Sequence, residues 1–62
     1  MKYNIGDKVW VSIVDDAAEW YYCGPATIRY IFSPEFDWDY KVKIPIAHRG
    51  CGIKEEEIKY EI

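Results

Sequence analysis

Residues 8–14, Lys-Val-Trp-Val-Ser-Ile-Val, alternate between aliphatic and mixed side chains with a period of two. On an extended chain, one face carries only aliphatic side chains, namely Val9, Val11 and Ile13. The opposite face is amphipathic and includes Trp10 and Ser12. This pattern is typical of a β-strand that buries one face. The segment Ile5-Gly6-Asp7 before it predicts a turn.

Residues 40–44, Tyr-Lys-Val-Lys-Ile, show the clearest alternation in the chain. Their three apolar side chains would point inward and their two lysines outward, as in a half-buried strand. Pro45 ends this strand, because proline cannot donate a hydrogen bond to a neighbouring strand.

Turn-forming residues divide the rest of the chain into shorter segments. The breaker Gly24-Pro25 precedes a predicted second strand in which Ala26, Ile28 and Tyr30 share a face. A loop is expected at residues 33–37. Further along, the pattern predicts three short elements: a fourth strand at 48–53, one helical or 3₁₀ turn at 54–57 and a fifth strand at 59–62.

The segment before Gly24 has one alternative interpretation. Asp16 and Glu19 have the spacing of a helix capping box, so a short helix could reach Tyr22. The run Trp20-Tyr21-Tyr22 favours extended structure instead. We therefore expect a polar loop at residues 15–19 and no structural helix.

The size and charge of the chain limit its function. It has 62 residues and a net charge of −3, from 11 acidic and 8 basic side chains. A single domain of this size, here residues 1–62, buries only about 60% of its unfolded surface, which argues against a deep enzyme pocket.

No stretch resembles a signal peptide or a membrane span, so we expect a soluble, cytoplasmic protein. Cys23 and Cys51 are then expected to be free thiols.

In this order of elements the chain resembles the SH3-like small β-barrels, a broad group that includes SH3, Tudor and KOW-type modules and the plasmid-encoded trimethoprim-resistant dihydrofolate reductases. The resemblance covers residues 3–62. Three segments carry it: Ile-Gly-Asp-Lys-Val-Trp-Val at 5–11, Ala-Thr-Ile-Arg-Tyr-Ile at 26–31 and Glu-Glu-Glu-Ile at 55–58. It implies an all-β fold, a small five-stranded SH3-like barrel with a short 3₁₀ turn before the last strand. It implies no activity, because the reductases line their pore with Val-Gln-Ile-Tyr, whereas residues 50–53 here are Gly-Cys-Gly-Ile.

Catalytic and metal chemistry receive little support from the residue types. Cys23, His48 and Cys51 are the only soft metal ligands in the chain, and structural zinc nearly always takes four. A nucleophilic Cys–His pair would also need an orienting group and a pocket. We therefore expect a protein that is not an enzyme, with no catalytic residue, no metal and no cofactor.

Two stretches that overlap the expected loops, residues 15–22 and 35–39, combine acidic and aromatic side chains. In SH3-like barrels the corresponding loops flank one groove, so the resemblance implies a single acidic-aromatic patch. Its expected members are Asp15, Asp16, Glu19, Trp20, Tyr22, Glu35, Phe36, Asp37, Trp38 and Asp39. Aromatic rings supply contact area and carboxylates select a cationic partner. In SH3 domains a tryptophan at the position of Trp38 helps to bind proline-rich peptides that carry a basic residue. Core packing of Trp20 or Trp38 is the structural alternative.

Outward-facing cations provide an alternative binding surface. Arg29, Lys41, Lys43 and Arg49 could share one face of the sheet beside aromatic rings, a pattern typical of KOW-like and Tudor-like nucleic-acid binders. The acidic loops would repel phosphate over a Debye length of about 8 Å, and exposed lysines also serve solubility. The sequence thus favours a protein partner over nucleic acid.

The sequence therefore predicts a small non-catalytic protein-binding module whose acidic-aromatic patch engages a basic partner. That partner could be a basic peptide, a free or methylated lysine tail, or the basic nucleic-acid site of a host enzyme. The last case is typical of short bacteriophage-encoded inhibitors, which are similarly small and acidic. Self-association through the aromatic side chains is a further alternative, and no membrane contact is expected.

Overall fold

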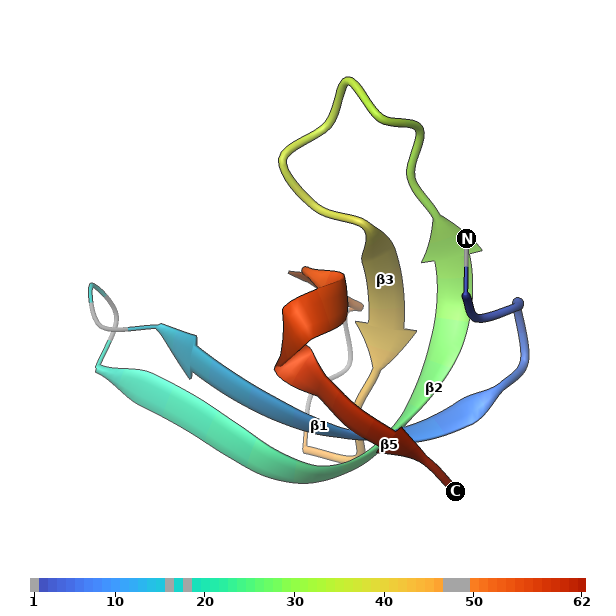
Figure 1. Cartoon of the computed structure of the whole chain (residues 1–62). Helices are drawn as coiled ribbons and strands as arrows, with labels where there is room; N and C mark the ends of the chain where they lie inside the picture. Colours follow the sequence, from blue (N-terminus) through green and yellow to red (C-terminus); the bar gives the residue numbers. More distant parts are fainter. Residues whose placement is uncertain (1, 16, 18, 47–49) are drawn as a thin grey trace.

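The chain folds into five antiparallel strands that form one sheet, curled into a half-barrel (Figure 1). The computed structural model describes residues 2–15, 17, 19–46 and 50–62. Its elements in chain order are β1 (Lys8–Asp15), β2 (Trp20–Ile31), β3 (Tyr40–Lys43), β4 (Cys51–Ile53), the 3₁₀ turn η1 (Glu55–Glu57) and β5 (Ile58–Glu61). The predictions of an all-β fold and of a 3₁₀ turn before the last strand are confirmed. Within the described residues, no helix is long and apolar enough to cross a membrane.

The strand order in the sheet is β4-β3-β2-β1-β5. The first four strands form a meander, and β5 then returns to pair with β1 at the opposite edge. The long strand β2 belongs to both parts of the curl. It pairs with β1 from Trp20 to Thr27 and with β3 from Thr27 to Ile31.

The hydrophobic core fills the inner face of the curled sheet. It consists of Tyr3, Val9, Val11, Ile13, Ala26, Ile28, Tyr40, Val42, Ile44, Ile53 and Ile58. The inward alternation predicted for residues 8–14 and 40–44 is confirmed, since the predicted inward residues of both stretches are buried. Lys41 and Lys43 are exposed on the outer face, as expected. In the described part of the chain, every buried side-chain polar atom has a hydrogen-bond partner.

The start of β2 differs from the prediction. The strand begins at Trp20 and continues through Gly24-Pro25, so neither the expected break nor the alternative helix is present in this segment. Proline fits here because, among the described residues, this half of β2 pairs with β1 alone, where Pro25 lies opposite Trp10. Proline lacks a backbone N–H, and a strand tolerates it where one of its edges has no neighbouring strand to receive that hydrogen bond. The Tyr22 hydroxyl donates a 2.7 Å hydrogen bond to the carbonyl oxygen of Pro25, which adds a contact within β2 at this position.

A register shift in the middle of β2 moves Tyr30 away from the core. Ile28 pairs with Val42 of β3, but Tyr30 pairs with Lys41, so the register changes across Arg29. Such a bulge adds a residue to one strand and reverses the alternation beyond it. Tyr30 is consequently 53% exposed, although the simple alternation placed it on the face of Ala26 and Ile28.

The last two strands are shorter or shifted relative to the prediction. β4 covers only Cys51–Ile53 of the expected 48–53, of which residues 48 and 49 lie outside the described part of the chain. β5 begins one residue earlier than expected, at Ile58, and this side chain joins the core.

Candidate functional site

An acidic-aromatic pocket lies where the end of the β1–β2 hairpin approaches β4. It has a volume of about 440 Å³ and is lined by Ile13, Val14, Asp15, Trp20, Trp38, Cys51, Gly52 and Glu57. The pocket brings together Trp20 and Trp38, one from each of the two predicted loop segments. Trp20 is half-buried and packs against the core, whereas Trp38 is 48% exposed.

Neighbouring residues fix the position of Trp38. Its ring lies over the backbone of β4, because a Cβ atom at Gly52 would come within 2.8 Å of the Cγ and Cδ2 atoms of Trp38. Phe32 supports the ring from another side, with ring centroids 6.1 Å apart. The absence of a side chain at Gly52 therefore makes room for Trp38 at the pocket wall.

The charged side chains among the described lining residues of this pocket are acidic. Asp15 and Glu57 line it, and none of its described lining residues is basic. Glu57 Oε1 accepts a 2.9 Å hydrogen bond from the backbone N–H of Lys54, which fixes the side chain at the end of η1. A cavity with two indole rings and two carboxyl groups suits a cationic group, since the rings attract cations through their π-faces.

The remaining members of the predicted patch lie elsewhere. Tyr22 packs against the core, and Phe36 packs on Phe32 with centroids 5.4 Å apart. Asp39 Oδ2 accepts a 2.9 Å hydrogen bond from the backbone N–H of Glu55. Other members of the patch are exposed in turns or loops: Glu19, Glu35 and Asp37. Asp16 lies outside the described residues.

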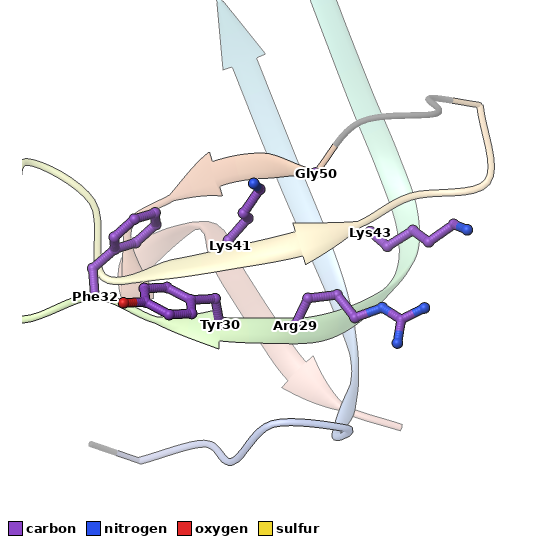
Figure 2. Close-up of a pocket in the computed structure, with 6 residues that line it drawn as sticks. All are labelled: Arg29, Tyr30, Phe32, Lys41, Lys43 and Gly50. Atoms are coloured by element: carbon purple, nitrogen blue, oxygen red, sulfur yellow. The ribbon is translucent and has the colours of Figure 1, made fainter.

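A second depression, the basic-aromatic groove, runs along the outer face of β2 and β3 (Figure 2). Its volume is about 600 Å³, and its lining residues are Arg29, Tyr30, Phe32, Lys41, Lys43 and Gly50. Three of the four cations proposed from the sequence for nucleic-acid binding thus share one site. The fourth, Arg49, lies outside the described residues.

The local structure explains how this groove forms. The bulge at Arg29 exposes both Arg29 and Tyr30, and it places Tyr30 opposite Lys41. The Tyr30 ring then meets the Phe32 ring edge to face, with centroids 5.1 Å apart. On the other side, the Lys41 side chain extends toward Gly50, where a Cβ would lie 2.6 Å from its Cε atom.

The cysteines and the possible metal ligands do not form a site within the described residues. Cys23 is exposed, Cys51 is half-buried, and both are free. Burial raises the pKa of the Cys51 thiol. No group of three or more His, Cys, Asp or Glu side chains is placed to hold a metal ion in the described part of the chain. His48, the third possible soft ligand in the sequence, lies outside that part.

Sequence reasoning missed Glu57 in the pocket and Tyr30 and Phe32 in the groove. Glu57 belongs to an acidic run that looks like an exposed surface turn, and only the packing of η1 brings it near Trp20. The alternation in the sequence placed Tyr30 on the same face as Ala26 and Ile28, and no residue type in the sequence indicates a bulge at Arg29. Phe32, just after a strand, gave no signal that it would support Trp38.

Comparison with known proteins gives no further identification. Searches of protein-family models, of curated proteins and of solved structures find no match to this chain.

Proposed function

We propose that the curled sheet is an SH3-like barrel and that the protein is a non-catalytic protein-binding module. Its acidic-aromatic pocket would receive a lysine or arginine side chain from a basic segment of the partner. The observation that carries this proposal is the position of Trp20 and Trp38, which line one pocket together with Asp15.

The chemistry of the pocket supports a cationic ligand. Two indole rings provide flat apolar walls, and a cation over such a ring gains about 0.5–2 kcal/mol, depending on its desolvation. Asp15 and Glu57 add negative charge at the same place. The net charge of −3 would also attract a basic partner over a longer range and increase the association rate.

The position of Trp38 supports its role as an anchor. Aromatic residues in pockets carry much of the binding energy of protein interfaces. Trp38 is 48% exposed, so the ring retains surface for a partner, while packing against Phe32 and over Gly52 holds it in place. This arrangement gives a preformed contact that costs little entropy on binding.

Binding kinetics with short labelled peptides test the proposal. We expect an arginine- and lysine-containing peptide to bind, and a peptide with glutamate at the basic positions not to bind. Asp15→Asn and Glu57→Gln should slow association, because exposed charges steer the encounter. Trp38→Ala should accelerate dissociation, because an anchor residue contributes about 2 kcal/mol or more.

Glu61→Gln is the matched control, since it removes one negative charge at the exposed end of β5. Circular dichroism and chemical unfolding verify that each variant is folded. If Glu61→Gln affects association as strongly as Asp15→Asn, general charge rather than this pocket controls binding. If no basic peptide binds at low salt, the proposal is wrong.

A further inference from the structure

We propose that the basic-aromatic groove is a second binding site, which takes single-stranded nucleic acid. The inference goes beyond the proposed function, because this groove lies on the outer face of β2 and β3 and contains none of the residues that line the acidic-aromatic pocket. The proposal rests on three cations, Arg29, Lys41 and Lys43, and on the rings of Tyr30 and Phe32.

The cations of the groove are available for a ligand. Arg29, Lys41 and Lys43 are all exposed. No ion pair or hydrogen bond joins their side chains to another described residue, and no carboxyl group is among the described residues that line the groove. Three clustered positive charges with no partner among the described residues repel one another, and a phosphate backbone would relieve that repulsion while releasing its own counterions.

The aromatic rings distinguish nucleic acid from other polyanions. Tyr30 is 53% exposed and meets Phe32 edge to face, so a large part of the side chain remains accessible to a planar ligand. Stacking of a base on an exposed ring is the usual device of single-strand binders. A duplex would not use it, because the faces of its bases are already stacked on each other.

The arrangement of these groups fits a single-stranded nucleic acid that has one base at the aromatic end of the groove and its adjoining phosphates at the basic end. Figure 2 shows the rings of Tyr30 and Phe32 toward one end of the groove and the head groups of Arg29 and Lys43 toward the other. Lys41 extends between them, toward Gly50. A base would stack at the aromatic end, and the adjoining phosphates would lie along the cations.

The distribution of acidic residues explains how a chain with a net charge of −3 can bind a polyanion. Among the described residues, the carboxyl groups lie in turns, in η1, at strand ends and in the loop after Phe32. Glu35 and Asp37 of that loop follow the aromatic end of the groove in the sequence. Their charge favours a short bound segment that runs toward Arg29 and Lys43 rather than over the loop.

Fluorescence anisotropy with labelled oligonucleotides of about ten nucleotides, a usual footprint for a small single-strand-binding domain, tests this site. We expect homopyrimidine single-stranded DNA and RNA to bind, and a duplex of the same length to bind much more weakly. Arg29→Gln and Lys43→Gln should each weaken binding roughly five- to tenfold at low salt and reduce the logarithmic salt slope by about 0.7. Tyr30→Ser should weaken binding roughly fivefold or more and leave that slope unchanged.

Lys59→Gln is the matched control. It removes the same charge from β5, which lies at the edge of the sheet opposite to β4, and it should leave affinity within twofold of the original chain. A polyglutamate peptide tests whether any polyanion suffices, and we expect it to bind weakly and without dependence on Tyr30. Equal effects of Lys59→Gln and Lys43→Gln, equal binding of duplex and single strand, or equal binding of polyglutamate would each overturn the proposal.

The same titrations separate this inference from the proposed function. Asp15→Asn should weaken the binding of basic peptides and leave oligonucleotide binding intact, whereas Arg29→Gln should do the opposite. If oligonucleotides do not bind although basic peptides do, the groove proposal is wrong and the pocket proposal stands.

Discussion

Trp38 covers Gly52 so closely that a Cβ atom at position 52 would lie 2.8 Å from the indole ring. This contact links the loop between β2 and β3 to the edge strand β4 and forms one wall of the acidic-aromatic pocket. The Trp38 ring also packs against Phe32, which lines the basic-aromatic groove. The two candidate sites are therefore separated by one pair of aromatic rings.

The first prediction concerns this contact. Gly52→Ala should displace the Trp38 ring, because the new methyl group would occupy space held by a rigid ring rather than by a flexible chain. The indole N–H resonance of Trp38, assigned with a Trp38→Phe variant, should shift in the two-dimensional NMR spectrum. Binding of basic peptides should weaken in parallel.

Gly50→Ala is the control for this change. A Cβ at position 50 would also be too close to a neighbour, but that neighbour is the flexible side chain of Lys41. Lys41 can rotate away at little cost, so the Trp38 resonance should keep its position. An unchanged Trp38 resonance in Gly52→Ala would show that the ring does not pack on β4.

The second prediction concerns the two faces of β3. Val42 is fully buried, so Val42→Ala should lower the free energy of unfolding by about 1–3 kcal/mol through lost contacts and a residual cavity. Lys41→Ala on the exposed face should change it by less than about 0.5 kcal/mol. Chemical denaturation measures both, and similar losses for the two variants would contradict the inward-outward register of this strand.

The third prediction concerns the stability of the fold at alkaline pH. The Tyr40 ring is fully buried, and its hydroxyl donates a 3.1 Å hydrogen bond to Glu55 Oε1 and accepts a 3.3 Å hydrogen bond from the backbone N–H of Tyr3. Burial raises the pKa of Tyr40, the hydrogen bond from Tyr3 lowers it, and the carboxylate of Glu55 raises it further, so that the net direction is upward. The folded state therefore holds this proton more tightly than the unfolded state does.

It follows that the contribution of Tyr40 to stability is complete below the ordinary tyrosine pKa of about 10 and is lost as the pH rises through the higher pKa of the folded state. Tyr40→Phe should lower the free energy of unfolding at neutral pH by about 1–2 kcal/mol through the lost hydrogen bonds, and it should flatten the decline above pH 10. Tyr21→Phe, at a side chain that is 74% exposed, is the control. A decline of the same size in the Tyr40→Phe variant would refute this assignment.

The fourth prediction concerns the cysteines. Cys23 is exposed, whereas Cys51 is half-buried and burial raises the pKa of its thiol. A thiol reagent should therefore modify the native protein in a fast step at Cys23 and a slow step at Cys51, because the thiolate is the reactive form and must be accessible. The slow rate should increase as the pH rises, since more Cys51 becomes ionised.

Single variants assign the two steps. Cys23→Ser should remove the fast step and Cys51→Ser the slow one, while both thiols should react rapidly after denaturation. Equal rates in the native protein would mean that β4 does not protect Cys51.

Much of the fold could be predicted from the sequence because the deciding signal is local. In β1 and β3 each buried position is two residues from the next, so the inner faces with Val9 and Val42 follow from the alternation itself. The 3₁₀ turn at Glu55–Glu57 follows from an acidic run too short for a stable helix. The path of β2 through Gly24-Pro25 could not be predicted from the sequence, because whether a strand tolerates proline depends on which of its edges is already paired.

The sites depended more strongly on tertiary structure. The sequence by itself identified Asp15, Trp20 and Trp38, and separately Arg29, Lys41 and Lys43, as residues suited to binding. Only the curl of the sheet decided which of them meet, since it brings the β1–β2 hairpin near β4 and adds Glu57 from η1 to the pocket. Only the register shift at Arg29 decided that Tyr30 joins the groove. Alternation is a property of neighbouring residues, whereas curl and register arise from pairing between distant strands, which no short stretch of the chain determines.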